Sequence, residues 1–472
     1  MNIIKNKKVI LAIKNMVFVA GLLFIYLNLS SLFELKDSKI KYTPFIEQTQ
    51  DFDVLFFGTS HVRCGYLPME MWDKYGIVSY NFGASSPEIA TSYWNAMLAL
   101  EHTNPKLIVF DISRLTANRR VNKVESAHNE FDIFPFSRTK CAAVYDLFKD
   151  GSKDAKNVDI SGRWSEMLWN FQLYHNRWNE LTEEDFAYTP TLEKGATSQY
   201  KLAKPVDYEL IPREQYNEID NISTEYLEKL IDECKNRNIQ ILLTYLPGTL
   251  NEAKQLGANY GYEIAKKHNV EFVNFMYLTE LLDYNTDFND TSSTSCHLNV
   301  SGAKKTSLYL AEYIQENYQI PNRKENPQYQ SWEQDWEKYK LSKKDKLINT
   351  DDFHSYLVQA ADTDYRITFT IRGGQVLSFD ETKLGLMENL SLNQNLTMLH
   401  EALSKGENYQ FVIDHGAGEV RENTGDAVLY DSCLSWNEYE DAHIEIVVED
   451  NQTNEVVDKS LWAVSGRSVK RK

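Results

Sequence analysis

The sequence contains little cysteine, and this shortage argues against two classes of protein. Five cysteines occur among 472 residues, they are widely spaced, and none forms a CxxC pair. A disulfide framework needs a denser set of cysteines, and a structural zinc site needs closely spaced pairs. The ten histidines include no HExxH motif, the signature of helical zinc proteases.

Positive charge is also scarce. The chain has 50 lysines and arginines against 68 aspartates and glutamates, which gives a formal net charge of −18. A nucleic-acid-binding protein needs a basic stripe that displaces counterions from phosphates, and none follows the first residues. We therefore expect no nucleic-acid partner. The hydrophobic share of 42% is enough for a sizeable core, and the length exceeds that of one ordinary domain.

The N-terminus has the pattern of a membrane anchor. Lysines at positions 5, 7 and 8 precede an apolar segment, and no charged residue occurs from Met16 to Phe33. Roughly 18 helical residues rise about 27 Å, close to the hydrocarbon thickness of a bilayer. We expect a cytoplasmic tail at 1–8, a transmembrane helix at 9–33 and an extracytoplasmic body on the cell membrane. A cleaved signal peptide is the alternative, although the segment 28–31 lacks an A-x-A site.

The next part of the chain predicts an α/β domain. We expect a polar, extended stalk at 34–50, an α/β domain at 51–320, and within it a long insertion at 115–220. Short apolar strands alternating with amphipathic helices indicate a parallel sheet that is covered on both faces. The predicted strands are 54–57, 77–82, 107–110, 239–244 and 270–273, and the predicted helices are 87–102, 226–237 and 253–267.

Composition changes after residue 320. The segment 321–350 is dense in charged and amide residues, which is typical of a linker or a solvated helix. Beyond it, 365–371, 409–413 and 443–448 alternate polar and apolar residues with period two. This alternation predicts half-buried strands, so we expect a β-rich C-terminal domain at 351–472.

A candidate nucleophile follows the first predicted strand, in Gly58-Thr59-Ser60-His61. Ligands of parallel α/β sheets bind at the carboxyl ends of the strands, where Ser60 is expected. Gly58 permits a sharp turn, and the N–H groups that open the next helix can face a developing oxyanion. By itself, however, Gly-x-Ser is also common in ordinary turns.

A candidate base occurs much later, in Cys296-His297-Leu298-Asn299, just before an amphipathic helix that reaches about Tyr318. A serine becomes nucleophilic when a base removes its proton. From this loop His297 can reach Ser60 across the ends of the strands. The alternative is an exposed histidine near the start of a helix.

The combination of a strand followed by Gly-x-Ser and of His-Leu-Asn-x-x-Gly-Ala-Lys before a final helix resembles the SGNH (GDSL-like) hydrolases. It is most similar to membrane-anchored members that modify cell-surface polymers by O-acylation. The resemblance covers about 50–320 and implies a three-layer, parallel-sheet domain. It also implies that Ser60 is the nucleophile, that His297 is the base, and that the N–H groups of Ser60 and Gly83 form the oxyanion hole. The family's asparagine after the third strand is replaced by Asp111, and a carboxylate donates a hydrogen bond only when protonated.

The pattern leaves two candidates for the third catalytic residue. In the family an aspartate lies three residues before the histidine, but position 294 is a threonine. An insertion at 291–295 accounts for the difference, and it leaves Asp290 and Asp287 as candidates to orient His297. We favour Asp290.

Four further residues are predicted to bind substrate. His61 and Arg63 lie just beyond the nucleophile, where they are expected to line the pocket. His175 and Arg177 belong to the aromatic-rich stretch 174–178 of the insertion, and such groups suit contacts with sugars. A structural helix with a satisfied histidine is an equal alternative for that stretch.

The expected function is therefore extracytoplasmic O-acetylation, or another serine acyl transfer, on a cell-surface polysaccharide, or ester hydrolysis there. The chemistry requires no cofactor and no metal. The resemblance implies a multi-spanning membrane acyltransferase as a partner that supplies the acyl group. Two alternatives remain: D-alanyl transfer to teichoic acid, and a non-catalytic scaffold that binds glycan or a membrane partner.

Overall fold

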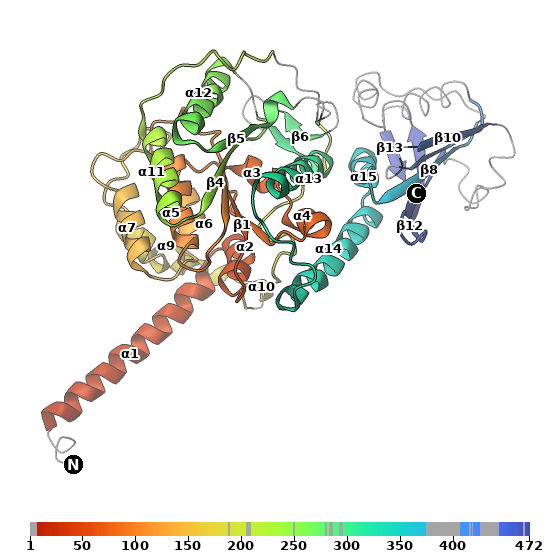
Figure 1. Ribbon diagram of the computed structural model, residues 1–472. Coiled ribbons are helices and arrows are strands. Elements are labelled where there is room, and N and C mark those ends of the chain that lie inside the picture. Colours follow the sequence, from red (N-terminus) through yellow and green to blue (C-terminus); the bar gives the residue numbers. More distant parts are fainter. Residues whose placement is uncertain are drawn as a thin grey trace.

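The chain forms one long N-terminal helix, a mixed α/β body and a separate C-terminal sheet, as Figure 1 shows. This computed structural model confirms the predicted α/β class and the β-rich C-terminal part. The described residues are 7–186, 189–203, 209–248, 251–278, 281–282, 287–291, 296–373, 406–414, 417, 419–424, 443–465 and 468–472.

Helix α1 (Lys7–Phe33) projects away from the body. From Lys8 to Phe33 it is long and apolar enough to cross a membrane, and none of its most apolar stretch is buried against the rest of the chain. A helix of this length rises about 40 Å, more than the roughly 30 Å hydrocarbon core. The large apolar side chains between Ile10 and Leu29 are therefore mostly exposed, and burial against the body begins near the end of the helix, with Phe33.

The body is built on a five-stranded parallel sheet with strand order β2-β1-β3-β4-β5. All of β1 and β3 is buried, because helices cover both faces of the sheet. The order changes direction between β1 and β3, and open α/β sheets bind their ligands at such a switch point. The strands are β1 (Val54–Phe57), β2 (Ser79–Asn81), β3 (Leu107–Asp111), β4 (Gln240–Tyr245) and β5 (Glu271–Asn274).

Two groups of helices enclose this sheet. One face packs against α3 (Ser60–Gly65), α4 (Pro68–Tyr75) and α13 (Val300–Asn317). The opposite face packs against α5 (Ile89–Ala99), α11 (Ile222–Asn236) and α12 (Glu252–His268). The helices predicted at 87–102, 226–237 and 253–267 are thus present with slightly shifted ends.

The predicted extended stalk at 34–50 is wrong. Helix α2 (Lys36–Ile46) occupies it and packs on the body. Tyr42 and Phe45 lie three residues apart and so share one helical face. Each is 2% exposed, and Phe45 stacks on Phe52 at a ring-centroid distance of 5.1 Å. The body is therefore held directly at the end of α1.

The described part of the insertion at 115–220 combines irregular chain with several short helices. They are α6 (Val124–Phe131), α7 (Arg138–Leu147), α8 (Trp164–Leu168), α9 (Phe171–Tyr174), η2 (His175–Asn179) and α10 (Glu183–Phe186). After β5 come η3 (Phe275–Tyr277) and a small antiparallel ribbon of β6 (Phe288–Thr291) and β7 (Cys296–Leu298). The sequence did not predict this ribbon.

The C-terminal part begins with η4 (Pro327–Tyr329), α14 (Gln330–Ile348) and α15 (Phe353–Ala360). Helix α14 occupies the predicted linker, but one of its faces is buried through Trp332, Trp336 and Tyr339. An antiparallel sheet follows, with strand order β10-β9-β8-β11-β12-β13. Its strands are β8 (Tyr365–Ile371), β9 (Tyr409–Asp414), β10 (Glu419–Thr424), β11 (Ile444–Asp450), β12 (Val456–Ser465) and β13 (Ser468–Arg471).

A buried ion cluster joins the two parts of the chain. Lys343 Nζ of α14 lies 3.0 Å from Glu70 Oε1 of α4 and 2.8 Å from Asp362 Oδ2. Lys304 Nζ of α13 lies 2.5 Å from Asp362 Oδ1. Burial alone would raise the pKa of Asp362, but the two ammonium groups hold it well below its usual range. The cluster thus connects three helices to the start of the C-terminal sheet.

Substituting one cation of this cluster tests how much the cluster stabilises the junction between the α/β body and the C-terminal sheet. Lys343→Met leaves buried carboxylates short of a partner, so we expect a loss of about 3–5 kcal/mol in the free energy of unfolding. Lys340→Met is the matched control on the same helix, because Lys340 pairs with the largely exposed Glu337 and its loss costs about 1 kcal/mol or less. Denaturant unfolding of the full chain measures both. Equal losses in the two variants would contradict a structural role for the cluster.

Candidate active site

Ser60 begins helix α3 immediately after the β1 turn. Gly58 in this turn has φ +153°, and a Cβ there would lie 2.6 Å from Val62 Cγ2 and 2.7 Å from Asp111 Cβ. Only glycine fits this close approach of β3 and α3. The turn therefore brings Ser60 to the carboxyl end of β1, beside the switch point of the sheet.

The β6–β7 ribbon carries the other two residues of a Ser-His-Asp arrangement. Asp290 and His297 are directly opposite each other in the antiparallel pairing. His297 Nδ1 lies 2.8 Å from Asp290 Oδ2, and the backbone N–H of His297 donates to Asp290 Oδ1 at 3.2 Å. His297 Nε2 lies 2.7 Å from Ser60 Oγ, although the residues are 237 positions apart. A neutral imidazole with its proton on Nδ1 thus donates to Asp290 and accepts from Ser60.

Of the two candidate carboxylates, the structure brings Asp290 to His297. Asp287 is fully buried and faces helix α13 instead. Its Oδ1 accepts from Ser301 Oγ at 2.9 Å, and its Oδ2 lies 2.8 Å from Lys305 Nζ. These contacts connect Asp287 to the first turn of the helix that follows His297.

The predicted oxyanion hole is only partly present. Ser60 is the first residue of α3, so its N–H has no acceptor within the helix. The N–H of Gly83, by contrast, donates to Asn81 Oδ1 at 2.8 Å and so is already engaged. The expectation that Gly83 offers a free donor is therefore wrong for this structure. A side chain at Gly83 would overlap the backbone of Arg63, which explains the glycine by close packing.

Asp111, in place of the expected asparagine, acts as an acceptor. Its Oδ1 accepts from the N–H of Ser113 at 3.1 Å and its Oδ2 from the N–H of Leu246 at 3.0 Å. Burial raises the pKa of this carboxyl to about 6. The side chain connects the end of β3 to the loop after β4 and supplies no donor there.

Asn81 has a positioning role that the sequence analysis missed. Its Nδ2 donates to the carbonyls of Val62 and Tyr66 at 2.8 Å each, while its Oδ1 accepts from Gly83. The side chain is fully buried and fixes α3 against the end of β2. The available signal was an amide at the end of an otherwise apolar strand, where a buried polar group requires partners.

His61 lies beside His297. The centroid of its ring is 5.2 Å from that of His297, and its Nδ1 lies 3.0 Å from Thr59 Oγ1. Burial, together with the neighbouring His297, lowers the pKa of His61 to about 3. The ring is therefore neutral near pH 7 and places no positive charge next to His297. It lies near Gly248, and its predicted role as a pocket-lining residue stays a prediction.

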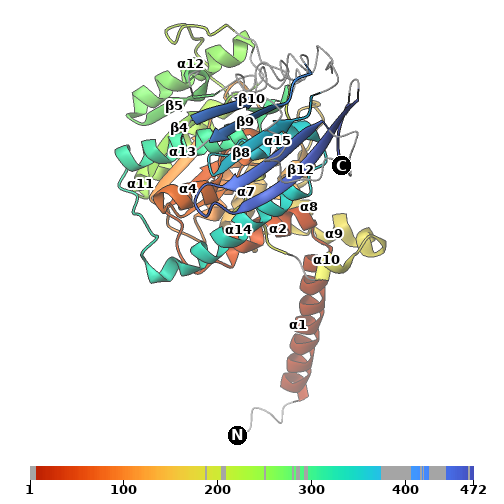
Figure 2. The same ribbon diagram turned by 90° about the vertical axis from the view of Figure 1, so that its right-hand side faces the viewer.

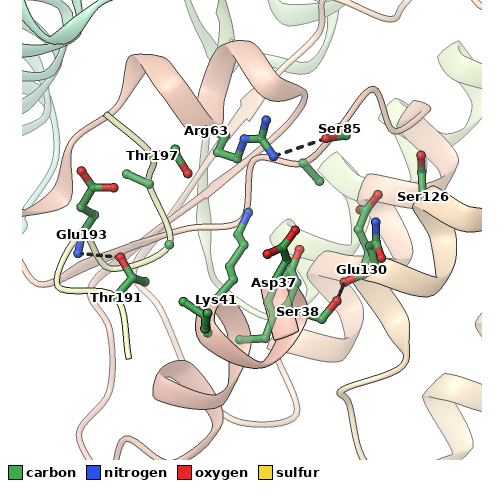
Figure 3. Close-up of a pocket in the computed structure, with 16 residues that line it drawn as sticks. Asp37, Ser38, Lys41, Arg63, Ser85, Ser126, Glu130, Thr191, Glu193 and Thr197 are labelled. Atoms are coloured by element: carbon green, nitrogen blue, oxygen red, sulfur yellow. Dashed lines mark hydrogen bonds between the residues drawn. The ribbon is translucent and has the colours of Figure 1, made fainter. Parts of the chain in front are cut away.

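Arg63 faces a separate cavity of about 450 Å³ beside Gly83 (Figure 3). Arg63 Nη1 donates to Ser85 Oγ at 3.3 Å, and Lys41 donates to the carbonyl of Gly83. Burial raises the pKa of Glu130 to about 8 and lowers that of Lys41 to about 7. Ser60, His297 and Asp290 do not line this cavity, whereas Arg63 of α3 and the chain after Gly83 do.

The structure does not bring His175 and Arg177 to Ser60. Arg177 donates to the carbonyl of Glu34 at 2.6 Å and to Asp185 Oδ1 at 3.0 Å, beside the end of α1 (Figure 2). The exposed His175 makes a local contact of 2.8 Å between Nδ1 and the carbonyl of Gln172. Arg177 thus joins the insertion to the end of α1, and the predicted substrate-binding role of both residues stays a prediction.

Comparison with known proteins identifies no relative. The chain matches no protein-family model, and no curated protein sequence matches it at a significant level. Any assignment of function therefore rests on the geometry of the residues around Ser60.

Proposed function

We propose that the chain is a membrane-anchored, extracytoplasmic serine acyltransferase or esterase of the SGNH type that acts on cell-surface polysaccharide. One observation carries the proposal: His297 lies within hydrogen-bond distance of Ser60 through Nε2 and of Asp290 through Nδ1. A base between a hydroxyl and a carboxylate is the arrangement that activates a serine nucleophile.

The first half-reaction forms an acyl-enzyme. Ser60 Oγ attacks the carbonyl carbon of an acyl donor while its proton moves to His297 Nε2. Asp290 stabilises the resulting imidazolium, and the N–H of Ser60 donates to the oxyanion. The intermediate collapses with cleavage of the bond to the leaving group, which takes the proton from His297.

The second half-reaction releases the acyl group. A sugar hydroxyl gives its proton to His297 and attacks the acyl carbonyl, so that the ester moves to the polymer and Ser60 regains its proton. Water in place of the sugar gives hydrolysis. The balance between transfer and hydrolysis thus depends on which hydroxyl occupies the space next to His297.

The cavity beside Arg63 is suited to the acceptor. Its lining combines hydrogen-bond donors of Lys41 and Arg63 with acceptors of Glu130 and Glu193. Sugar hydroxyls both donate and accept, so they match such a mixed lining better than a purely anionic or apolar ligand does. Arg63 lies three residues after Ser60 in α3 and so connects the cavity to the helix that carries the proposed nucleophile.

Helix α1 supplies the proposed anchor. With lysines at positions 5, 7 and 8 at its N-terminal end, the positive-inside rule puts the N-terminus in the cytoplasm and the body outside. A multi-spanning membrane acyltransferase is then a suitable source of the acyl group. D-alanyl transfer to teichoic acid has the same requirements and differs only in the acyl group and the polymer.

A non-catalytic scaffold is the second candidate, and specific observations favour it. The N–H of Gly83 is engaged by Asn81, and Asp111 accepts hydrogen bonds where a donor was expected. Loss of one oxyanion donor reduces turnover by about 10²–10³ in a well-characterised serine protease. The proposed enzyme is therefore expected to be slow with simple esters.

Substitutions in the Ser-His-Asp arrangement test the proposal. For the full-length protein in detergent, Ser60→Ala should reduce aryl acetate hydrolysis to background, and His297→Ala should lower kcat by about 10²–10⁴ because the general base is lost. Asp290→Asn should also lower kcat. Asp287→Asn is the matched control and should retain kcat, since Asp287 contacts α13. Thermal unfolding verifies that each variant is folded.

The same variants should be compared in cells by the ester content of the envelope polymer. Wild-type ester content in a strain with only Ser60→Ala would contradict an acyltransferase. Equal aryl acetate hydrolysis by wild type and Ser60→Ala would contradict an enzyme that uses this serine.

Arg63→Gln tests the acceptor cavity. The guanidinium charge is lost but Ser60 and His297 keep their contacts, so the KM for the polymer acceptor should rise while kcat for aryl acetate stays near wild type. Steady-state kinetics with both substrates measures the difference. A parallel fall in both activities would mean that Arg63 supports the fold of α3 and binds no acceptor.

A further inference from the structure

The insertion exposes large apolar side chains beside α1. Trp169 and Leu173 are 44% and 40% exposed, and Trp178 and Phe186 are each 70% exposed. We call these four residues the apolar collar. Trp169 follows α8, and the other three belong to α9, η2 and α10, the elements that pack against α1 (Figure 2). Exposed apolar side chains gathered in one region of a protein mark a site of interaction.

Contacts with α1 define the level of the collar along that helix. The ring of Tyr26 lies 6.1 Å from Trp169 and 5.4 Å from Phe171, centroid to centroid. Polar contacts begin one turn further on, where Ser30 Oγ lies 2.7 Å from Asn170 Oδ1. Aromatic contact continues as far as Phe33, whose ring centroid lies 5.8 Å from that of Phe171, so α1 meets this segment between residues 26 and 33.

This level agrees with the expected boundary of a bilayer. A hydrocarbon core of about 30 Å takes roughly 20 helical residues. Counted from Lys8, such a span ends near Asn28, between Tyr26 and Ser30. Counted from Lys14, whose long side chain can reach the inner interface, it ends near Glu34. Both choices put Trp169 at the outer boundary of the hydrocarbon or just within it.

The charges around the apolar collar indicate whether electrostatic attraction or the hydrophobic effect would draw it to a membrane. Its polar neighbours Glu180, Glu183 and Glu184 are acidic, whereas Lys36 and Arg177 pair with Asp185. Attraction to anionic lipid headgroups is therefore not the source of binding. Tryptophan and phenylalanine side chains instead suit the zone between headgroups and acyl chains, where apolar rings leave water.

We propose that the apolar collar inserts into the interfacial zone of the outer leaflet, so that a lipid bilayer is its partner. The inference rests on the proposed membrane span of α1 and goes beyond the proposed chemistry. Together, α1 and the collar attach the body to the membrane at two points. Two points restrict rotation of the body about α1 and fix the height of Ser60 above the lipid surface.

An added tryptophan in the collar tests the inference in the full-length protein. Phe186→Trp should place its emission within reach of a nitroxide near the headgroup end of phosphatidylcholine acyl chains. In vesicles of this lipid alone, most of the added emission should be quenched by the nitroxide and little by aqueous iodide. Subtracting the wild-type fluorescence from that of the variant gives the emission of the added tryptophan.

Tyr262→Trp is the matched control. Tyr262 is an exposed aromatic residue of α12, which lies at the opposite end of the body from α1 (Figure 1). Its added emission should be quenched by iodide and not by the lipid nitroxide. Iodide quenching of Phe186→Trp without nitroxide quenching would overturn the proposal, as would equal nitroxide quenching of both variants. Neither outcome involves catalysis, so the function of Ser60 is tested separately.

Discussion

The proposed catalytic site depends on the pairing of Asp290 with His297 across the β6–β7 ribbon. Because the two residues are opposite each other in an antiparallel pair, both a side-chain and a backbone donor of His297 reach one carboxylate. The imidazole is thereby fixed with Nε2 toward Ser60 Oγ, 2.7 Å away. A ribbon displaced by one residue would turn the side chain of His297 to the opposite face, and no base would remain beside the serine.

The other half of the site is held by the parallel sheet. Gly58 lets α3 begin directly after β1, and Asn81 fixes α3 to the end of β2 through two backbone carbonyls. These contacts join the switch point of the sheet to the chain around Gly83. The side chain of Asn81 also affects the proposed chemistry. Its Oδ1 accepts the hydrogen bond of the Gly83 N–H, which was predicted to donate to the oxyanion. The proposed site thus combines close Ser60–His297–Asp290 contacts with an engaged N–H at Gly83.

Strong local patterns made much of the fold predictable. Continuous apolar strands predicted the parallel sheet, and period-two alternation predicted β8, β9 and β11. The prediction of an extended stalk was wrong. The buried face of α2 includes two aromatic residues, Tyr42 and Phe45, three positions apart among mostly polar neighbours, and so short a pattern does not predict a helix. Ser60, His297 and Asp290 were recognisable from motif order, but the engagement of Gly83 and the contacts of Arg177 with the end of α1 arise from tertiary packing. No local pattern carries that information.

Covalent labelling is the most direct test of the claim that His297 activates Ser60. A fluorophosphonate reacts with a serine whose proton is removed by a neighbouring base, and mass spectrometry of the digested full-length protein locates the adduct. The account predicts an adduct on the peptide that contains Ser60, with much slower formation in His297→Ala. An unlabelled Ser60 in folded protein, or the same labelling rate in both proteins, would contradict it.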